Sequence, residues 1–353
     1  MSKKTFHNIL CPGCFSEIKP NNVVFTAGKG PIYYDKYSEA QITNNITSKI
    51  REYIDPALFS GSKTYSDDGV LLKLEDSEKG ISADIRLCPY CHYELPYAFI
   101  GNKKTHIVSV LGCSGAGKSV YERALIYALR NNGFTMSVKN DNWEIDTMNP
   151  ADYNVPHSSG SERDSKSTWS ATTEIRGPYI YNAQNEEEDF LLVLYDLPGE
   201  LFNTTREITD SYVSSILRKS DLVVFIIDPT NPRNSRISLE NYLNLLEIES
   251  FTPNNLAILV NKIDDIETNN IYEAFATFSK KHTVPGSDSE NIRSLIEKHF
   301  FNLPQNLPAN TSYFTSQLFV KPGSEWVWGP QLHEEPFLWW LQTNKSVDKK
   351  GKK

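Results

Sequence analysis

The chain has 353 residues, with 36 Lys and Arg residues against 44 Asp and Glu residues, so its formal net charge is −8. Such a length exceeds one domain of typical size and suits two domains. The acidic balance argues against nucleic acid or anionic lipid binding over the whole surface. A membrane span needs about 18 consecutive apolar residues, and no stretch of the chain approaches that length. The N-terminus also lacks a signal-peptide core, so the sequence predicts a cytoplasmic location.

Two C-P-x-C turns come first along the chain, one formed by Cys11 and Cys14 and the other by Cys88 and Cys91. Each turn can direct both thiolates at one metal ion, so the two pairs can supply the four sulfur ligands of a structural Zn²⁺ site. The competing interpretation is a disulfide or a redox pair, for which a single C-x-x-C at the start of a helix would be expected. The fifth cysteine, Cys113, is expected to be a small buried residue and not a ligand.

The wide gap between the cysteine pairs predicts an insertion. Within it, Val23 to Thr26 and Gly69 to Leu74 resemble strands, and Ser38 to Tyr53 has the spacing of a moderately amphipathic helix. The insertion contains no catalytic pattern. Few basic residues lie near the cysteines, so this module is expected to contact protein or stabilise the fold rather than to bind nucleic acid.

A glycine-rich run, Gly112 to Ser119 (GCSGAGKS), satisfies the full G-x-x-x-x-G-K-[ST] pattern. It follows the apolar run Thr105 to Leu111, an expected strand, and precedes Val120 to Asn131, an expected helix. In that context the backbone N–H groups and the helix start hold a polyphosphate, while the lysine reaches the terminal phosphates and the last serine hydroxyl binds Mg²⁺. The expected phosphate-binding residues are Gly112, Ser114, Gly115, Ala116, Gly117, Lys118 and Ser119.

The apolar run Phe190 to Tyr195 is followed by the sequence DLPGE. At the end of such a strand, the Asp196 carboxylate can hold Mg²⁺ through water, and the Gly199 N–H can meet a γ-phosphate. The next residue, Glu200, can accept a hydrogen bond from an attacking water, or it can cap the following helix. Both roles remain open from the sequence.

A further apolar run, Leu256 to Val260, follows an expected amphipathic helix, Leu239 to Ile248, and precedes the sequence NKID. The Asp264 carboxylate can accept hydrogen bonds from the N1–H and N2 amino groups of guanine. Adenine lacks this donor pair, so one such residue can discriminate between the bases by a factor on the order of 10⁴. Lys262 is expected to lay its stem along the base, and Asn261 to tie the segment back to the glycine-rich run.

The C-terminal part supplies a last site segment and a last helix. Tyr313 to Leu318 follows a possible strand, and backbone N–H groups near Ser316 and Gln317 can meet the guanine O6. Glu335 to Gln342 (EPFLWWLQ) is expected to form a helix whose tryptophans pack on the sheet. The basic segment Lys345 to Lys353 is expected to be a disordered tail.

In this order, and with a strand before each, these motifs resemble the Ras-like GTPases of the translation-factor-related (TRAFAC) class over residues Thr105 to Gln342. The resemblance implies an α/β fold with a doubly wound, mostly parallel sheet. It also implies binding of GTP and Mg²⁺, slow hydrolysis to GDP, and a switch driven by loss of the γ-phosphate. The family further needs a switch threonine that completes the Mg²⁺ shell. Thr172 or Thr173 fits best here, with Thr168 as the alternative, beside the long polar segment Asp141 to Ser170, an expected mobile switch region.

Two residues depart from the common family pattern. Glu200 stands where many members place a glutamine that orients the attacking water, and its negative charge would face the γ-phosphate. Intrinsic hydrolysis is therefore expected to be slow, with an activating protein completing the site. Ser114 stands where small GTPases often have glycine, and it can limit the approach of an arginine finger, which Arg206 or an external arginine would supply.

A zinc ribbon joined directly to such a domain, with an EPxLW-like last helix, also resembles the prokaryotic double-GTPases and related conflict-system GTPases, which would imply partner proteins of a multi-gene system. The predicted domains are a zinc-ribbon-like α+β module with an insertion (1–104), a GTPase domain (105–343) and a disordered basic tail (344–353). The predicted activity is a GTP-hydrolysing switch that controls a partner protein. The alternatives are a GTP-binding adaptor with negligible hydrolysis and an ATP-dependent protein sharing only the phosphate loop. The predicted catalytic residues are Lys118, Thr173, Gly199 and Glu200.

Overall fold

A computed structural model describes residues 7–26, 53–67, 69–95, 99–138, 178–202, 211–266, 269–278, 284–320 and 327–350. Several predicted features lie outside these residues: the insertion helix apart from its last residue, the switch segment from Asp141 to Ser170, the candidate threonines Thr168, Thr172 and Thr173, and Arg206. The chain divides into two compact units, one formed by Met1–His106, Ser137–Glu144 and Ile180–Val193, and the other by the remainder.

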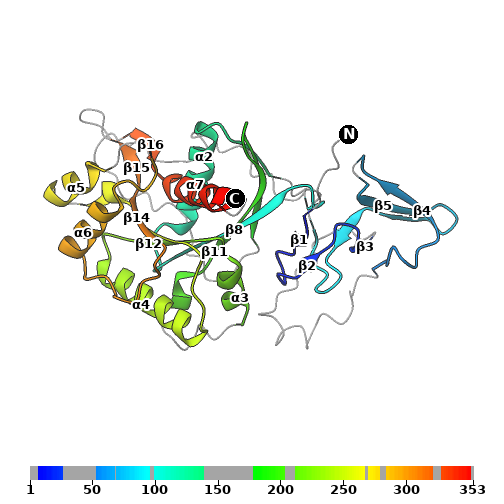
Figure 1. The fold of residues 1–353 in the computed structure, drawn as a ribbon, viewed down its shortest axis with the longest axis horizontal. Helices are drawn as coiled ribbons and strands as arrows, with labels where there is room; N and C mark the ends of the chain where they lie inside the picture. Colours follow the sequence, from blue (N-terminus) through cyan, green and yellow to red (C-terminus); the bar gives the residue numbers. More distant parts are fainter. Residues whose placement is uncertain are drawn as a thin grey trace. The chain divides into compact units, whose positions relative to one another are not determined.

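The N-terminal part is built from short antiparallel strands (Figure 1). They form two pairs, β1 with β2 and β3 with β7, and a three-stranded sheet of order β4-β5-β6. Their bounds are β1 Ile9–Leu10, β2 Glu17–Ile18, β3 Val24–Thr26, β4 Ser62–Tyr65, β5 Leu71–Asp76, β6 Ile81–Ala83 and β7 Ile85–Leu87. The described residues thus confirm a small cysteine-rich β module.

A seven-stranded sheet of order β14-β13-β12-β8-β11-β10-β9 forms the centre of the larger part of the chain. The strands β8, β12, β13 and β14 are parallel neighbours, as continuous apolar runs buried on both faces predict. The strands are β8 Lys104–Gly112, β9 Thr135–Val138, β10 Tyr179–Gln184, β11 Asp189–Asp196, β12 Leu222–Ile227, β13 Leu256–Val260 and β14 Thr311–Thr315. The predicted α/β class with a mostly parallel sheet is therefore confirmed.

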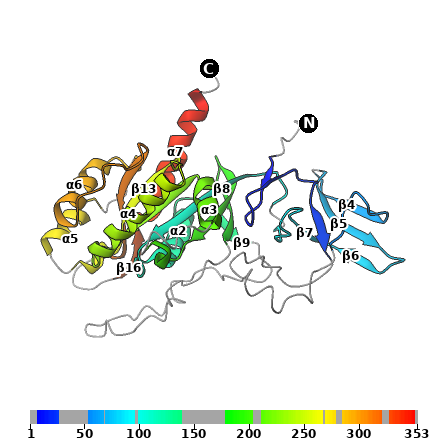
Figure 2. The same cartoon turned by 90° about the horizontal axis from the view of Figure 1, so that it is seen from below.

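Helices cover both faces of this sheet: α2 and α7 lie on one side, and α3 and α4 on the other (Figures 1 and 2). The helices are α2 Lys118–Asn131, α3 Ser211–Lys219, α4 Pro232–Ile248, α5 Asn269–Ala276, α6 Ser289–His299 and α7 Glu335–Lys350. Two 3₁₀ turns, η2 Gly199–Phe202 and η3 Ile263–Asp265, follow β11 and β13, and the strands β15 Gln317–Val320 and β16 Val327–Gln331 form an antiparallel pair. Among the described residues, no helix combines the length and apolarity that crossing a bilayer requires.

Two helices differ from their expected bounds. The last helix, α7, continues to Lys350, so most of the segment expected to be a disordered tail is helical. No proline or glycine interrupts the segment before Gly351, so the turn that begins at Glu335 can propagate through the lysines. The helix α4 begins at Pro232 rather than at Leu239, because the Asn231 side chain accepts a hydrogen bond from the Asn234 N–H and caps the first turn.

Aromatic side chains fill the core between the sheet and its helices. Tyr242 of α4 stacks on Phe225 of β12 with ring centroids 6.1 Å apart, and neither side chain reaches solvent. Of the two tryptophans of α7, Trp340 is buried, and the ring of Trp339 packs on that of Phe314 of β14 with ring centroids 5.7 Å apart. The tryptophans therefore anchor the last helix on the sheet.

Candidate functional site

The loop Gly112–Ser119, here called the glycine-rich loop, connects β8 to α2. Gly112, Gly115 and Gly117 have φ angles of 147°, 80° and 87°, which residues with a Cβ rarely adopt. Two of them also lie too close to neighbours for a side chain. A Cβ on Gly112 would stand 2.6 Å from the Ile226 carbonyl oxygen, and one on Gly117 would stand 2.8 Å from Asn261 Nδ2. The loop is therefore a tight strand-to-helix turn whose N–H groups suit an anion at the helix start.

Lys118 lies at the first position of α2 and is buried beneath the loop, with 7% of its surface exposed. Its Nζ donates hydrogen bonds to the carbonyl oxygens of Gly112 at 3.2 Å and Cys113 at 3.0 Å. Burial lowers the pKa of the Lys118 ammonium, and the Asp196 carboxylate opposes that shift. The loop thus holds a buried cation in its interior.

Ser119 and Asp196 come from different elements and meet at one point. The Ser119 hydroxyl donates to Asp196 Oδ2 at 2.5 Å, where β11 ends beside the start of α2. A hydroxyl and a carboxylate oxygen this close are ligands that Mg²⁺ accepts. The candidate third ligand, Thr173, lies outside the described residues.

Gly199 and Glu200 begin the turn η2 and contact the glycine-rich loop. A Cβ on Gly199 would stand 2.5 Å from the Ser114 nitrogen, so only glycine fits there. The Ser114 hydroxyl donates to Glu200 Oε1 at 2.8 Å, and Glu200 Oε2 is buried with no hydrogen-bond partner among the described residues. The two residues that depart from the family pattern therefore contact one another, which the sequence does not predict.

The segment after β13 is tied to the glycine-rich loop by two side chains. Asn261 Nδ2 donates to the Ala116 carbonyl at 3.3 Å, and Lys262 Nζ donates to the Gly115 carbonyl at 2.6 Å. The Ser316 hydroxyl, which is fully buried after β14, donates to Asn261 Oδ1 at 3.0 Å. Residues distant in sequence are thus joined into one network at the carboxyl edge of the sheet.

Asp264 lies on η3, with 8% of its surface exposed. The strand β15, which begins at the buried Gln317, packs against this turn. Tyr272 of α5 is also nearby: its pKa is raised by burial and further by the negative charge of Asp264. The neighbourhood of the candidate base-selecting carboxylate therefore includes the strand β15 and a tyrosine, Tyr272, to which no sequence pattern pointed.

Asp228, at the end of β12, is a second residue that sequence reasoning missed. Its Oδ2 accepts from Lys262 Nζ at 3.0 Å, and its Oδ1 accepts from the backbone N–H and hydroxyl of Thr230 at 2.9 and 2.6 Å. The sequence held a signal for this residue, because Asp228 directly follows a continuous apolar run just as Asp196 does.

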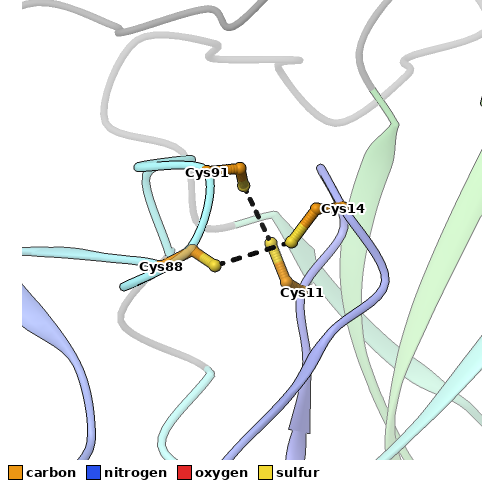
Figure 3. A group of neighbouring side chains, drawn as sticks. All are labelled: Cys11, Cys14, Cys88 and Cys91. Atoms are coloured by element: carbon orange, nitrogen blue, oxygen red, sulfur yellow. Dashed lines mark hydrogen bonds between the residues drawn. The ribbon is translucent and has the colours of Figure 1, made fainter.

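The four cysteines of the C-P-x-C turns form a separate cluster (Figure 3). The Sγ atoms of Cys11 and Cys91 lie 3.6 Å apart, those of Cys14 and Cys88 lie 3.7 Å apart, and all four lie within 4.8 Å of one another. Four thiolates at Zn–S distances of about 2.3 Å would lie about 3.8 Å apart in a tetrahedron. The sulfur positions therefore fit a single zinc ion, which the cluster could bind.

Both C-P-x-C turns have the same backbone geometry. Gly13 N–H donates to Cys11 Sγ at 3.3 Å, and Tyr90 N–H donates to Cys88 Sγ at 3.4 Å. Hydrogen bonding within the cluster lowers the pKa of the Cys14 thiol and that of Cys88, the latter to about 7, whereas the pKa values of Cys11 and Cys91 are raised. The cluster thus favours thiolates at Cys14 and Cys88, and a metal ion that bound there would release the protons of the other two thiols.

The nucleotide-site candidates thus gather where β8, β11, β12, β13 and β14 end, which is where open α/β sheets bind ligands. The seven-stranded sheet and the loop are compatible with a phosphate-binding fold. No protein-family model matches the chain, and a search of curated proteins finds no match either.

Proposed function

We propose that the chain is a Mg²⁺-dependent, GTP-hydrolysing molecular switch that binds its nucleotide at the carboxyl edge of the sheet. The observation that carries this proposal is the pair of hydrogen bonds from Asn261 and Lys262 to carbonyls of the glycine-rich loop. They tie the segment that would select the base to the loop that would hold the phosphates. A chance glycine-rich turn would have no reason to be fixed to an NKxD segment 145 and 147 residues away.

The phosphates would lie on the N–H groups of the glycine-rich loop and at the start of α2. Lys118 is already held inside the loop by two carbonyls, so it can turn its charge to the terminal phosphates over a short path. Ser119 and Asp196 would hold Mg²⁺, together with Thr173 from the first switch. When bound, Mg²⁺ would neutralise charge on the transferred phosphate.

The base would be selected by Asp264. A buried carboxylate is costly unless it receives hydrogen bonds, and guanine offers two adjacent donors, N1–H and the N2 amino group, at positions where adenine has no donor. Backbone N–H groups at Ser316 and Gln317 are the proposed donors to guanine O6. This arrangement would reject ATP, which distinguishes it from the ATP-dependent alternative.

Hydrolysis would involve Gly199 and Glu200. Ser114 holds the Glu200 carboxylate over the loop, which supports a role at the terminal phosphate rather than only at the start of η2. The second candidate function, a GTP-binding adaptor, is favoured by the negative charge of Glu200, which would oppose attack on an anionic phosphate. Turnover of GTP by purified protein separates the two, because an adaptor would show the buffer rate.

The N-terminal module would hold a structural zinc ion through Cys11, Cys14, Cys88 and Cys91. Four thiolates leave no open position for catalysis, so the ion would fix the fold of a small module. The partner of the switch is proposed to be a protein. Its retention on protein loaded with a non-hydrolysable GTP analogue, and not on the GDP form, is the corresponding test.

The base proposal is tested with Asp264→Asn and the matched control Asp265→Asn, whose carboxylate is exposed on the same turn. By calorimetry with Mg²⁺, wild-type protein should bind GTP more tightly than ATP by roughly 10⁴-fold. Asp264→Asn should lose that preference and gain affinity for xanthosine triphosphate, while Asp265→Asn keeps the wild-type order. Equal affinity of wild-type protein for GTP and ATP, or binding of neither, would refute the proposal.

A further inference from the structure

Asp228 is a buried acid that neither the glycine-rich loop nor the NKID motif contains. Only 4% of its surface is exposed, and both of its oxygens have partners: Thr230 on Oδ1, and Lys262 on Oδ2 at 3.0 Å. A carboxylate at such a position is costly unless it is paired and hydrogen-bonded, so its presence needs a reason.

The ammonium group of Lys262 is held from two sides. Its Nζ donates to Gly115 O at 2.6 Å and to Asp228 Oδ2 at 3.0 Å. A free lysine side chain loses rotamer entropy when it is ordered. These two hydrogen bonds fix the ammonium end of the Lys262 side chain. The methylene stem must therefore run from the end of β13 to the glycine-rich loop.

Asp228 is itself fixed by the start of α4. Its backbone N–H donates to the hydroxyl of the fully buried Ser235 at 2.9 Å, and its carbonyl accepts from the Asn231 N–H at 3.1 Å. The position of the carboxylate is therefore set by the helix and the sheet, and not by the lysine that it pairs with.

We propose that Asp228 is a positioning residue for the nucleotide, which acts by holding the Lys262 stem in place against the base and so slows nucleotide release. This inference rests on the proposed function, and it adds a residue that the motifs do not contain. In the competing case, Asp228 only closes the turn with Thr230, and its effect on the nucleotide does not pass through Lys262.

The test is a double-mutant cycle of Asp228→Asn and Lys262→Met on the full chain, read as the dissociation rate of a fluorescent GDP analogue chased with unlabelled GDP. Asparagine keeps an oxygen for Thr230 and removes the charge. Asp228→Asn should speed release about tenfold in wild-type protein and produce no further increase in Lys262→Met, as coupling between contacting residues predicts. The matched control is Glu240→Gln, which removes one charge from an ion pair with Arg236 on α4 and should leave the rate unchanged.

Salt gives a second readout that a purely structural role would not affect. Release from wild-type protein should accelerate as ionic strength rises, because the ion pair is partly screened, and this dependence should weaken in Asp228→Asn. Equal acceleration by Asp228→Asn in both backgrounds, or none in either, would overturn the inference while leaving guanine binding intact. Failure of wild-type protein to bind any guanine nucleotide would overturn the proposed function together with it.

Discussion

Replacement of Gly199 by alanine tests how closely the turn η2 fits the glycine-rich loop. The added Cβ would stand 2.5 Å from the Ser114 nitrogen and 2.6 Å from the Cys113 carbonyl carbon, where ordinary contact begins at 3.4 Å. The main chain of the loop or of the turn must therefore move away by about 0.9 Å, because the nearest atoms belong to the backbone and not to a flexible side chain.

Two effects of Gly199→Ala follow from that displacement. Overpacking of this kind costs about 1–3 kcal/mol of unfolding free energy. A shift of nearly 1 Å in groups that position the reacting phosphate should lower GTP turnover by roughly 10²-fold. Urea unfolding measures the first effect, and steady-state phosphate release measures the second.

Gly133→Ala is the matched control. Gly133 follows α2 with a φ of 85° and open space around its would-be Cβ, so alanine there costs about 1–2 kcal/mol through the backbone alone. This variant should lose stability and keep wild-type turnover. If Gly199→Ala kept wild-type stability and wild-type turnover, the inference that the turn η2 packs tightly on the glycine-rich loop would be refuted. Equal loss of turnover in both variants would show that the effect is not local.

Two further predictions concern the metal cluster and the core. Cys91→Ser should reduce bound zinc below one equivalent by atomic emission and lower the unfolding temperature, whereas Cys113→Ser, which changes the cysteine outside the cluster, should keep one equivalent. Tyr242→Phe should raise the unfolding free energy by about 1 kcal/mol at pH 7, because the buried Tyr242 hydroxyl has no hydrogen-bond partner among the described residues. Burial raises the pKa of Tyr242 above its ordinary value of 10.0, so above pH 10 this tyrosine ionises more readily in the unfolded chain and the free energy of unfolding falls as pH rises. Tyr242→Phe should therefore flatten the loss of stability in that range, and an unchanged slope in urea unfolding would contradict this.

The buried strands could be predicted closely because their signal is local. The run Leu256 to Val260 is β13 to the residue, and the run Phe190 to Tyr195 lies within β11. Both are apolar on each face, and both end at a polar residue that turns the chain. A sheet of such strands leaves little freedom in register or boundary.

Elements outside the sheet were harder to predict, because their patterns are mixed or their signals were passed over. The start of α4 is marked by an Asn-Pro pair, Asn231 and Pro232, which is a recognised helix start. The strands β15 and β16 are short, and their pairing depends on contacts that no local pattern records. The hydrogen bond between Ser114 and Glu200 joins residues 86 apart, so spacing alone could not predict it.

The end of each strand gives a rule that explains both what the sequence found and what it missed. Asp196 is the last residue of β11, and Asp228, Asn261 and Ser316 directly follow β12, β13 and β14. Each makes a side-chain hydrogen bond to the glycine-rich loop or to a residue that reaches it. Asp196 and Asn261 belong to the DLPGE and NKID motifs, and Ser316 was recognised from the possible strand before it. Asp228 belongs to none, yet the same geometry directs its carboxylate to the same place. In a parallel sheet, the residue after each buried strand is therefore a candidate for the site whether or not a motif names it.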